Sequence, residues 1–189
     1  MGRIRTFVAV DISNKIRDAA MRQIVKFSAL TKDYNWVYRD HMHVTLNFLG
    51  DVDESEVPAV CKLIKETVTD FGSFELSIKG LGCFPKPEKP RVIWLGIDQG
   101  DAELKQLQSQ LADALETMRF PRDRNDFHPH LTLGRLRRGA RWTDSIVDAV
   151  GSGSSVAGGS TVIEQVVIYS SFLDREGPTY TPMSKIDLV

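Results

Sequence analysis

The chain reads HMHVTLNFLG at residues 41–50 and HPHLTLGR at residues 128–135, and both stretches contain the pattern His-x-Thr-Leu. The pattern starts at His43 in the first copy and at His130 in the second, and all four histidines of the chain lie in these two stretches. If each stretch is a strand, the histidine and the threonine two residues later share one face. Each copy therefore predicts a strand with one chemical face and one core face.

Strict alternation assigns every side chain of these stretches to a face. The expected chemical faces carry His41, His43, Thr45 and Asn47 in the first copy, and His128, His130 and Thr132 in the second. The expected core faces carry Met42, Val44, Leu46 and Phe48, and Phe127, Leu131 and Leu133. Each histidine then lies about 6.6 Å from a hydroxyl on the same side of the strand, because a strand rises ~3.3 Å per residue.

Length and composition indicate a globular protein. The 189 residues, 42% hydrophobic and 26% charged, suffice for one substantial core or two intimately joined lobes. A net charge of -1 does not indicate general nucleic-acid binding, so any anion site must be local. There is no apolar run long enough to span a membrane and no secretory signal pattern, which predicts a cytoplasmic protein. Cys61 and Cys83 lack metal or disulfide spacing and are expected to be buried, reduced thiols.

Hydrophobic periodicity and turn residues predict the order of the other elements. In the first half we expect a strand at 4–10, a helix at 14–30 capped by Ser13, a short strand at 35–38, the first motif strand closed by Gly50, and a helix from an acidic start at 51–56 to about 69. A strand at 74–81, a loop broken by Pro85, Pro87 and Pro90, a strand at 91–97, a helix at 102–118 and the second motif strand should follow. The last part should form a helix at 142–150, a flexible loop at 151–159, and strands at 162–169 and 180–188 joined by a turn at 176–178.

This order contains a weak internal repeat of strand, long helix and His-x-Thr-Leu strand. His130 follows His43 by 87 residues, close to half the chain. The repeat predicts an α+β fold, residues 1–189 forming a single bilobal domain. Its two lobes would be related by pseudo-symmetry, with antiparallel or mixed sheets, helices outside and the motif strands side by side.

The two motifs with their flanks resemble the 2H phosphoesterase superfamily, and within it the RNA 2′,3′-cyclic phosphodiesterases, also called 2′-5′ RNA ligases. The flanks are Trp36-Val37, Phe48-Leu49-Gly50, GLGCFP at 80–85, RVIWLG at 91–96 and PHLTLGR at 129–135. The resemblance extends from about residue 6 to 186. It implies a sandwich whose two motifs face each other across a central cleft. It also implies that His43 donates a proton to the leaving oxygen and that His130 activates water.

The residues themselves suit this chemistry. Opening a cyclic phosphodiester with water needs a base, an acid on the opposite side of phosphorus, and donors for the charge on the phosphorus oxygens. Two histidines can fill the first two roles, because a pKa near ~6.5 allows both protonation states at neutral pH. Thr45 and Thr132 could donate hydrogen bonds to the phosphate. No metal or nucleotide cofactor is implied, since the chain lacks a phosphate-cradling Gly-x-x-x-x-Gly-Lys loop.

Arg135 would face away from His130 under strict alternation, but a bulge at Gly134 could turn it toward the phosphate. Six other arginines lie between residues 119 and 141: Arg119, Arg122, Arg124, Arg137, Arg138 and Arg141. Such a run could hold an RNA backbone or could form an ordinary solvated face. His41 and His128 are cleft-lining or catalytic candidates. The aromatic candidates for stacking on a base are Trp36, Tyr38, Phe84 and Trp94, with core packing favoured for Phe7, Phe48 and Trp94.

The expected function is metal-independent hydrolysis of RNA 2′,3′-cyclic phosphate ends to 2′-phosphomonoesters, with a possible reverse ligation to a 5′-hydroxyl. The partner is then an RNA end or a small cyclic nucleotide, bound by a monomer. Three alternatives stay open. The chain could act on another cyclic phosphate or on 2′-5′ oligonucleotides, it could bind nucleotides or RNA without turnover, or it could use its His-x-His pairs as metal ligands.

Overall fold

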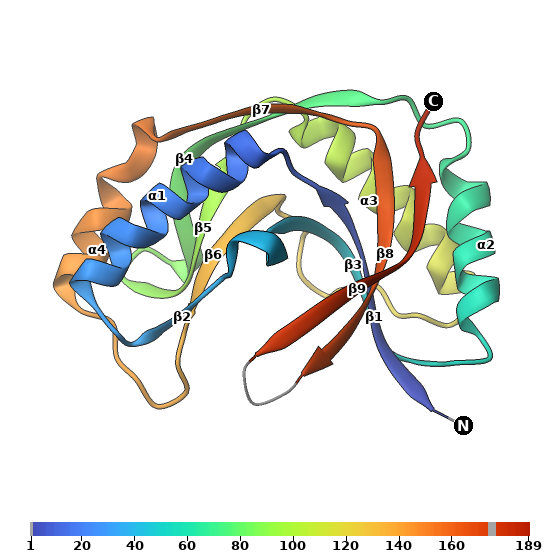
Figure 1. Ribbon diagram of the computed structural model, residues 1–189, viewed down its shortest axis with the longest axis horizontal. Coiled ribbons are helices and arrows are strands. Elements are labelled where there is room, and N and C mark those ends of the chain that lie inside the picture. The colour runs from blue at the N-terminus through green and yellow to red at the C-terminus, as the bar shows by residue number, and fades with distance from the viewer. Residues whose placement is uncertain (1, 174–176) are drawn as a thin grey trace.

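The computed structural model describes residues 2–173 and 177–189, so Glu176 of the expected turn lies outside the described residues. In these ranges the chain forms, in order, β1 (Arg3–Asp11), α1 (Asn14–Leu30), β2 (Tyr34–Trp36), the 3-10 turn η1 (Arg39–His41), β3 (His43–Asp53), α2 (Val57–Val68), β4 (Phe74–Lys86), β5 (Lys89–Ile97), α3 (Asp101–Thr117), β6 (His130–Leu136), α4 (Asp144–Gly151), the 3-10 turn η2 (Gly153–Ser155), β7 (Ala157–Ile163), β8 (Gln165–Leu173) and β9 (Pro178–Asp187) (Figure 1).

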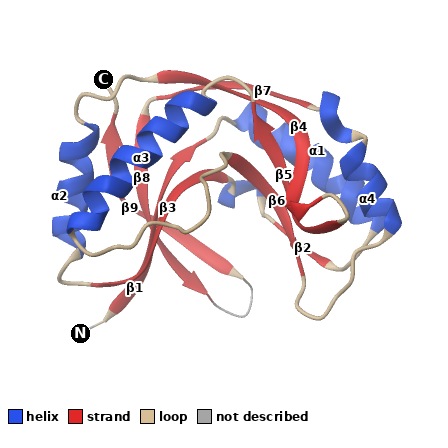
Figure 2. Ribbon diagram, turned by 180° about the vertical axis from the view of Figure 1, so that it is seen from behind, coloured by secondary structure: helices blue, strands red, loops and turns tan. Residues whose placement is uncertain are grey.

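The strands form two sheets, in the orders β3-β1-β8-β9 and β2-β6-β5-β4-β7. Every pairing in the described chain is antiparallel. Helices α2 and α3 pack on the first sheet, and α1 and α4 pack on the second. Figure 2 shows these helices on the outside of the molecule and the sheets curving around its centre. We call the sheet surfaces turned away from the helices the inner faces. The predicted α+β architecture with outer helices is confirmed.

The predicted pseudo-symmetry is present in the strand register. The pairing of β1 with β3 in the first sheet matches the pairing of β5 with β6 in the second. The histidine and the threonine of the β3 motif have partners in β1 at the positions where the matching residues of β6 have partners in β5. The matched pairs are Asp11 with His43, Ala9 with Thr45 and Phe7 with Phe48 in the first sheet, and Gly96 with His130, Trp94 with Thr132 and Val92 with Arg135 in the second. In both strands the register shifts at the leucine of the His-x-Thr-Leu pattern. The repeat in the sequence is therefore also a repeat of the strand pairing, and the register shift falls at the same position in both copies.

These bulges correct the predicted position of Phe48. Its side chain is 64% exposed, whereas the apolar alternation predicted a core residue. One shift leaves Leu46 without a partner in β1, so Phe48 comes opposite Phe7 on the inner face. A second shift follows at Leu49, whose side chain is buried instead. An extra residue in one strand reverses the alternation beyond it, which is why the pattern fails at this position.

Three predicted boundaries near the first motif are wrong. His41 lies in η1, and β3 begins only at His43. The strand continues past Gly50, which has a positive φ of 73°, to Asp53. Helix α2 then starts at Val57, because Asp51 and Asp53 pair with β1 as part of the strand. Similarly, His128 precedes β6, which begins at His130.

Two segments predicted as loops are largely regular. The proline-containing stretch belongs to a hairpin, in which β4 extends to Lys86 and β5 starts at Lys89. The Gly- and Ser-rich stretch at 151–159 contains the end of α4, η2 and the start of β7. Strand β7 pairs along β4, and this long-range pairing overrides the local preference for a loop.

The core follows the predicted helix faces. Ser13 caps α1 by accepting a hydrogen bond from the Ile16 amide, as expected. The leucines of α3 that recur at helical spacing are buried, namely Leu104, Leu107, Leu111 and Leu115. Cys83 is buried but Cys61 is only half-buried, and both are free thiols. None of the helices in the described ranges is long and apolar enough to cross a membrane.

Candidate active site

The two motif strands lie in different sheets and contact each other at the centre of the molecule. His43 is the first residue of β3, and His130 is the first residue of β6. Each histidine and the threonine two residues later lie on the inner face, and all four side chains are half-buried. Two histidines and two threonines therefore lie on the inner faces of two contacting strands, and their catalytic roles stay predictions.

The His130 ring is oriented by a backbone carbonyl. Its Nδ1 lies 2.7 Å from the carbonyl oxygen of His128. A carbonyl can only accept, so Nδ1 carries the proton, and Nε2 of the neutral ring is left with a lone pair. Burial lowers the pKa of His130, and the nearby Arg135 charge lowers it as well. This imidazole is consequently neutral at neutral pH and able to accept a proton.

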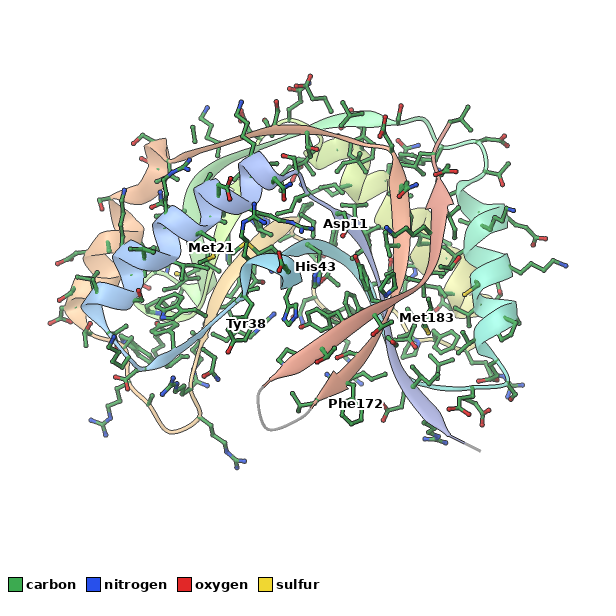
Figure 3. The ribbon with its side chains drawn as sticks, viewed as in Figure 1. Asp11, Met21, Tyr38, His43, Phe172 and Met183 are labelled. Carbon is green, nitrogen blue, oxygen red and sulfur yellow. The ribbon has the colours of Figure 1, made fainter. Side chains whose placement is uncertain are left out.

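His43 has a closely related environment. Burial lowers its pKa to about 4, while a hydrogen bond with the His41 backbone and the Asp11 carboxylate oppose that change. The ring stacks on Phe7 at 4.9 Å between centroids and contacts Tyr180 edge-on at 5.3 Å. The imidazole is thus held in a fixed orientation by a wall of aromatic rings. Figure 3 shows it among side chains at the centre of the molecule, beside Asp11.

The hydroxyls of Thr45 and Thr132 have no hydrogen-bond partner within residues 2–173 and 177–189. Both side chains share an inner face with the histidine of their own motif. A hydroxyl that lacks an internal partner is available to donate to a bound anion.

The Arg135 side chain is exposed on the inner face, as the predicted bulge requires. The register shift leaves Leu133 without a partner in β5 and brings Arg135 opposite Val92. Gly134 permits this geometry because the Trp36 ring occupies the space where a Cβ would stand. Burial lowers the pKa of His130 and raises that of Tyr180, and the Arg135 charge adds to the first change and opposes the second, so the guanidinium lies near both sheets. The prediction that a bulge re-aims this arginine is confirmed.

The other arginines of the predicted track do not form one uniform surface. Arg122 forms ion pairs with Asp113 and with Glu116, both on α3. The Arg137 guanidinium donates a hydrogen bond to Asn35 at 3.0 Å. Part of the positive run is therefore used within the fold.

His41 and His128 contribute to the aromatic surroundings of the site. The His41 ring contacts Tyr38 and Tyr180, and the His128 ring contacts Phe84 and Trp94. Each also offers its backbone to the motif histidine two residues later. Through those backbone groups they orient the motif histidines.

Several site residues were missed because they lie far from the motifs in sequence. Phe7, Tyr169 and Tyr180 reach His43 through the pairing of β1 with β3 and of β8 with β1 and β9. Of the predicted stacking candidates, Phe84 and Trp94 pack edge-on or tilted against His130. Tyr38 is 62% exposed. Only the strand order shows which of these rings meet.

A metal site or a ligand-binding hollow elsewhere in the described structure would be a competing site. In the described ranges no three His, Cys, Asp or Glu side chains are grouped as ligands of a metal ion. A hollow of about 850 Å³ is lined by the end of α2 and by α3, away from the motif histidines. Its lining includes Asp70, Phe71 and Glu103. The paired motifs are therefore the best-supported site for chemistry.

Comparison with known proteins identifies relatives that are similar over most of this chain. A family model described as the 2′-5′ RNA ligase superfamily matches residues 13–160. The RNA 2′,3′-cyclic phosphodiesterase of Methanothermobacter thermautotrophicus is 33% identical over 181 residues, which cover 96% of this chain and 97% of that protein. The protein of the same name from Archaeoglobus fulgidus is 33% identical and covers 94% of this chain and 96% of its own length.

Solved structures agree with these relatives. A protein from Thermus thermophilus superposes with a TM-score of 0.82 at 26% identity, covering 97% of each chain. Escherichia coli LigT in complex with 3′-AMP superposes with a TM-score of 0.76 at 25% identity, covering 99% of each chain. The matched family model and the relatives cover most of the sequence and both motif strands, and the chain belongs to the 2′-5′ RNA ligase superfamily.

Proposed function

We propose that this protein is an enzyme that hydrolyses RNA 2′,3′-cyclic phosphate ends to 2′-phosphomonoesters by two-histidine acid and base catalysis without a metal ion. The observation that supports this most strongly is the equivalent placement of two His-x-Thr pairs on contacting strands of two sheets. The names of its relatives, RNA 2′,3′-cyclic phosphodiesterases, describe the same reaction.

In the proposed mechanism, Nε2 of His130 takes a proton from water as the water oxygen attacks phosphorus. The bond between phosphorus and the ribose 3′ oxygen breaks, and His43 gives that oxygen a proton. The product is a 2′-phosphate and a free 3′-hydroxyl, so one water is consumed. Attack and departure are roughly in line, which two histidines on opposite walls can serve.

Charge on the phosphoryl oxygens needs donors. We assign this role to the Thr45 and Thr132 hydroxyls and to the Arg135 guanidinium. The bound phosphodiester is itself an anion, and its charge favours the protonated form of His43, whose pKa is about 4 in the empty site. Substrate binding therefore favours the protonation of His43, which supplies the proton that the leaving oxygen receives.

Ligation would join a 2′,3′-cyclic phosphate end to a 5′-hydroxyl as a 2′-5′ bond, with the 5′-hydroxyl in the place of water. His130 would then take the proton of the 5′-hydroxyl and His43 would again protonate the leaving 3′ oxygen, and the two roles exchange only when the 2′-5′ bond is cleaved back to the cyclic phosphate, as microscopic reversibility requires. All the groups assigned to the mechanism come from one chain. We therefore propose that the protein acts as a monomer, and we place it in the cytoplasm.

Turnover of separate substrates tests this proposal. The enzyme would be incubated in EDTA with an oligoribonucleotide ending in a 2′,3′-cyclic phosphate, with a 2′-5′-linked oligonucleotide and with ADP-ribose cyclic phosphate. The highest kcat/KM is expected for the oligoribonucleotide end. Faster turnover of either other substrate would reassign the substrate, and binding without turnover of any would identify a binding module instead.

A further inference from the structure

The two halves of the site are equivalent in geometry but opposite in charge. Opposite His43 across the β1–β3 pair stands Asp11, while opposite His130 the matching position is Gly96. The residue five positions after the histidine is Phe48 in the first half and Arg135 in the second. A carboxylate therefore lies beside one histidine and a guanidinium beside the other.

The Asp11 carboxylate is fixed in place. The Tyr169 hydroxyl donates a hydrogen bond to Asp11 Oδ1 at 2.7 Å, and the Tyr169 ring stacks with His43 at 5.9 Å between centroids. Directly opposed residues of an antiparallel pair have Cβ atoms about 5 Å apart on one face. Figure 3 shows Asp11 and His43 next to each other. Asp11 takes part in no ion pair within residues 2–173 and 177–189, so its charge is not neutralised by a salt bridge there.

The second half cannot carry the same group. A Cβ on Gly96 would stand 2.7 Å from the Lys79 carbonyl oxygen, so a side chain is excluded there unless the backbone moves. Packing thus prevents His130 from acquiring a cross-strand carboxylate. The difference between the two histidines is built into the fold.

Resting on the function proposed above, we propose that Asp11, held by Tyr169, is the positioning residue that makes His43 the proton donor of the pair. A carboxylate on the cross-strand neighbour of an imidazole stabilises the imidazolium, and a guanidinium beside the other imidazole stabilises its neutral form. The opposed charges bias the two rings toward different roles. Asp11 partly offsets the burial that lowers the pKa of His43, whereas the Arg135 charge adds to the burial that lowers the pKa of His130.

The other groups that face His43 do not replace this carboxylate. Arg17 on α1 and His41 in η1 both oppose protonation of His43. The two rings from β8 and β9, Tyr169 and Tyr180, have raised pKa values because of burial and are neutral at neutral pH. Asp11 is the one acidic side chain acting on His43 in the described chain.

Histidine titration by NMR, with the full chain and no substrate, tests the assignment directly. D11N keeps the shape of the side chain and removes its charge, and we expect it to lower the pKa of His43 by about one pH unit while that of His130 stays unchanged. R135Q is the matched control, expected to raise the pKa of His130 and leave that of His43 unchanged. Y169F retains the stacked ring but frees the carboxylate, and it should act on His43 as D11N does but less.

Kinetics provide the second readout. D11N should lower kcat on the cyclic phosphate end about tenfold and move the alkaline limb of the pH–rate profile to lower pH, and D11E should recover most of the activity. An unchanged His43 titration in D11N, or equal changes at both histidines, would overturn the assignment even in a fully active enzyme. A wild-type protein without turnover would overturn the proposed function instead. If D11N does not fold, the Y169F titration and pH profile decide in the same way.

Discussion

The low pKa of His43 makes folding stability depend on pH. The folded protein holds this imidazole neutral down to a pKa of about 4, whereas the unfolded chain protonates it near its usual value of 6.5. Between these values the unfolded state binds the extra proton, so stability is complete above about pH 6.5 and falls as the pH drops toward about 4. A difference of ~2.5 pH units corresponds to at most ~3.4 kcal/mol, and partial exposure of the ring reduces this to ~1–2 kcal/mol.

Urea unfolding at a series of pH values measures this effect. H43Q removes the titrating group, so the wild type should lose ~1–2 kcal/mol more unfolding free energy than the variant between about pH 7 and about pH 4.5. Comparison with the variant cancels the contribution of other groups, including His130, whose pKa is also lowered by burial. Equal losses in the two proteins would show that burial does not keep His43 neutral.

Three further outcomes follow from the site. T132V should lower kcat at least about tenfold while circular dichroism stays unchanged, because a phosphate hydrogen-bond donor is lost and the core face is untouched. R135Q should raise KM for the cyclic phosphate end, and the acidic limb of its kcat/KM profile should move to higher pH, since loss of the cation raises the pKa of His130. G82A should destabilise the fold by about 1–3 kcal/mol in thermal unfolding, because its Cβ would collide with the Trp94 ring that packs against His130.

The motif strands were predictable because their pattern is local. Alternation places a histidine and a threonine on one face and buried residues on the other, and Val44 and Leu131 are indeed fully buried. The spacing of the two copies also predicted the pseudo-symmetric lobes. Periodicity of two is a property of any strand, so it could be read without knowing the neighbouring strands.

The bulges and the surroundings of the histidines were less predictable. A glycine after His-x-Thr-Leu indicated the bulge that re-aims Arg135, but Asn47 follows the same pattern in the first copy and gave no such signal. Phe48 was consequently assigned to the core. Asp11 and Tyr169 are 158 residues apart and meet only through the order of strands in the first sheet. Such contacts depend on topology, which local patterns do not determine.

The central claim is that two histidines hydrolyse the cyclic phosphate without a metal ion. Phosphorus NMR tests it most directly, with an oligoribonucleotide ending in a 2′,3′-cyclic phosphate incubated in EDTA with the wild type, H43A or H130A. We predict that the wild type converts the cyclic phosphate to a 2′-phosphate and that each variant loses at least about a thousandfold in rate. Turnover that needs added metal, or that survives in either variant, would contradict the two-histidine mechanism.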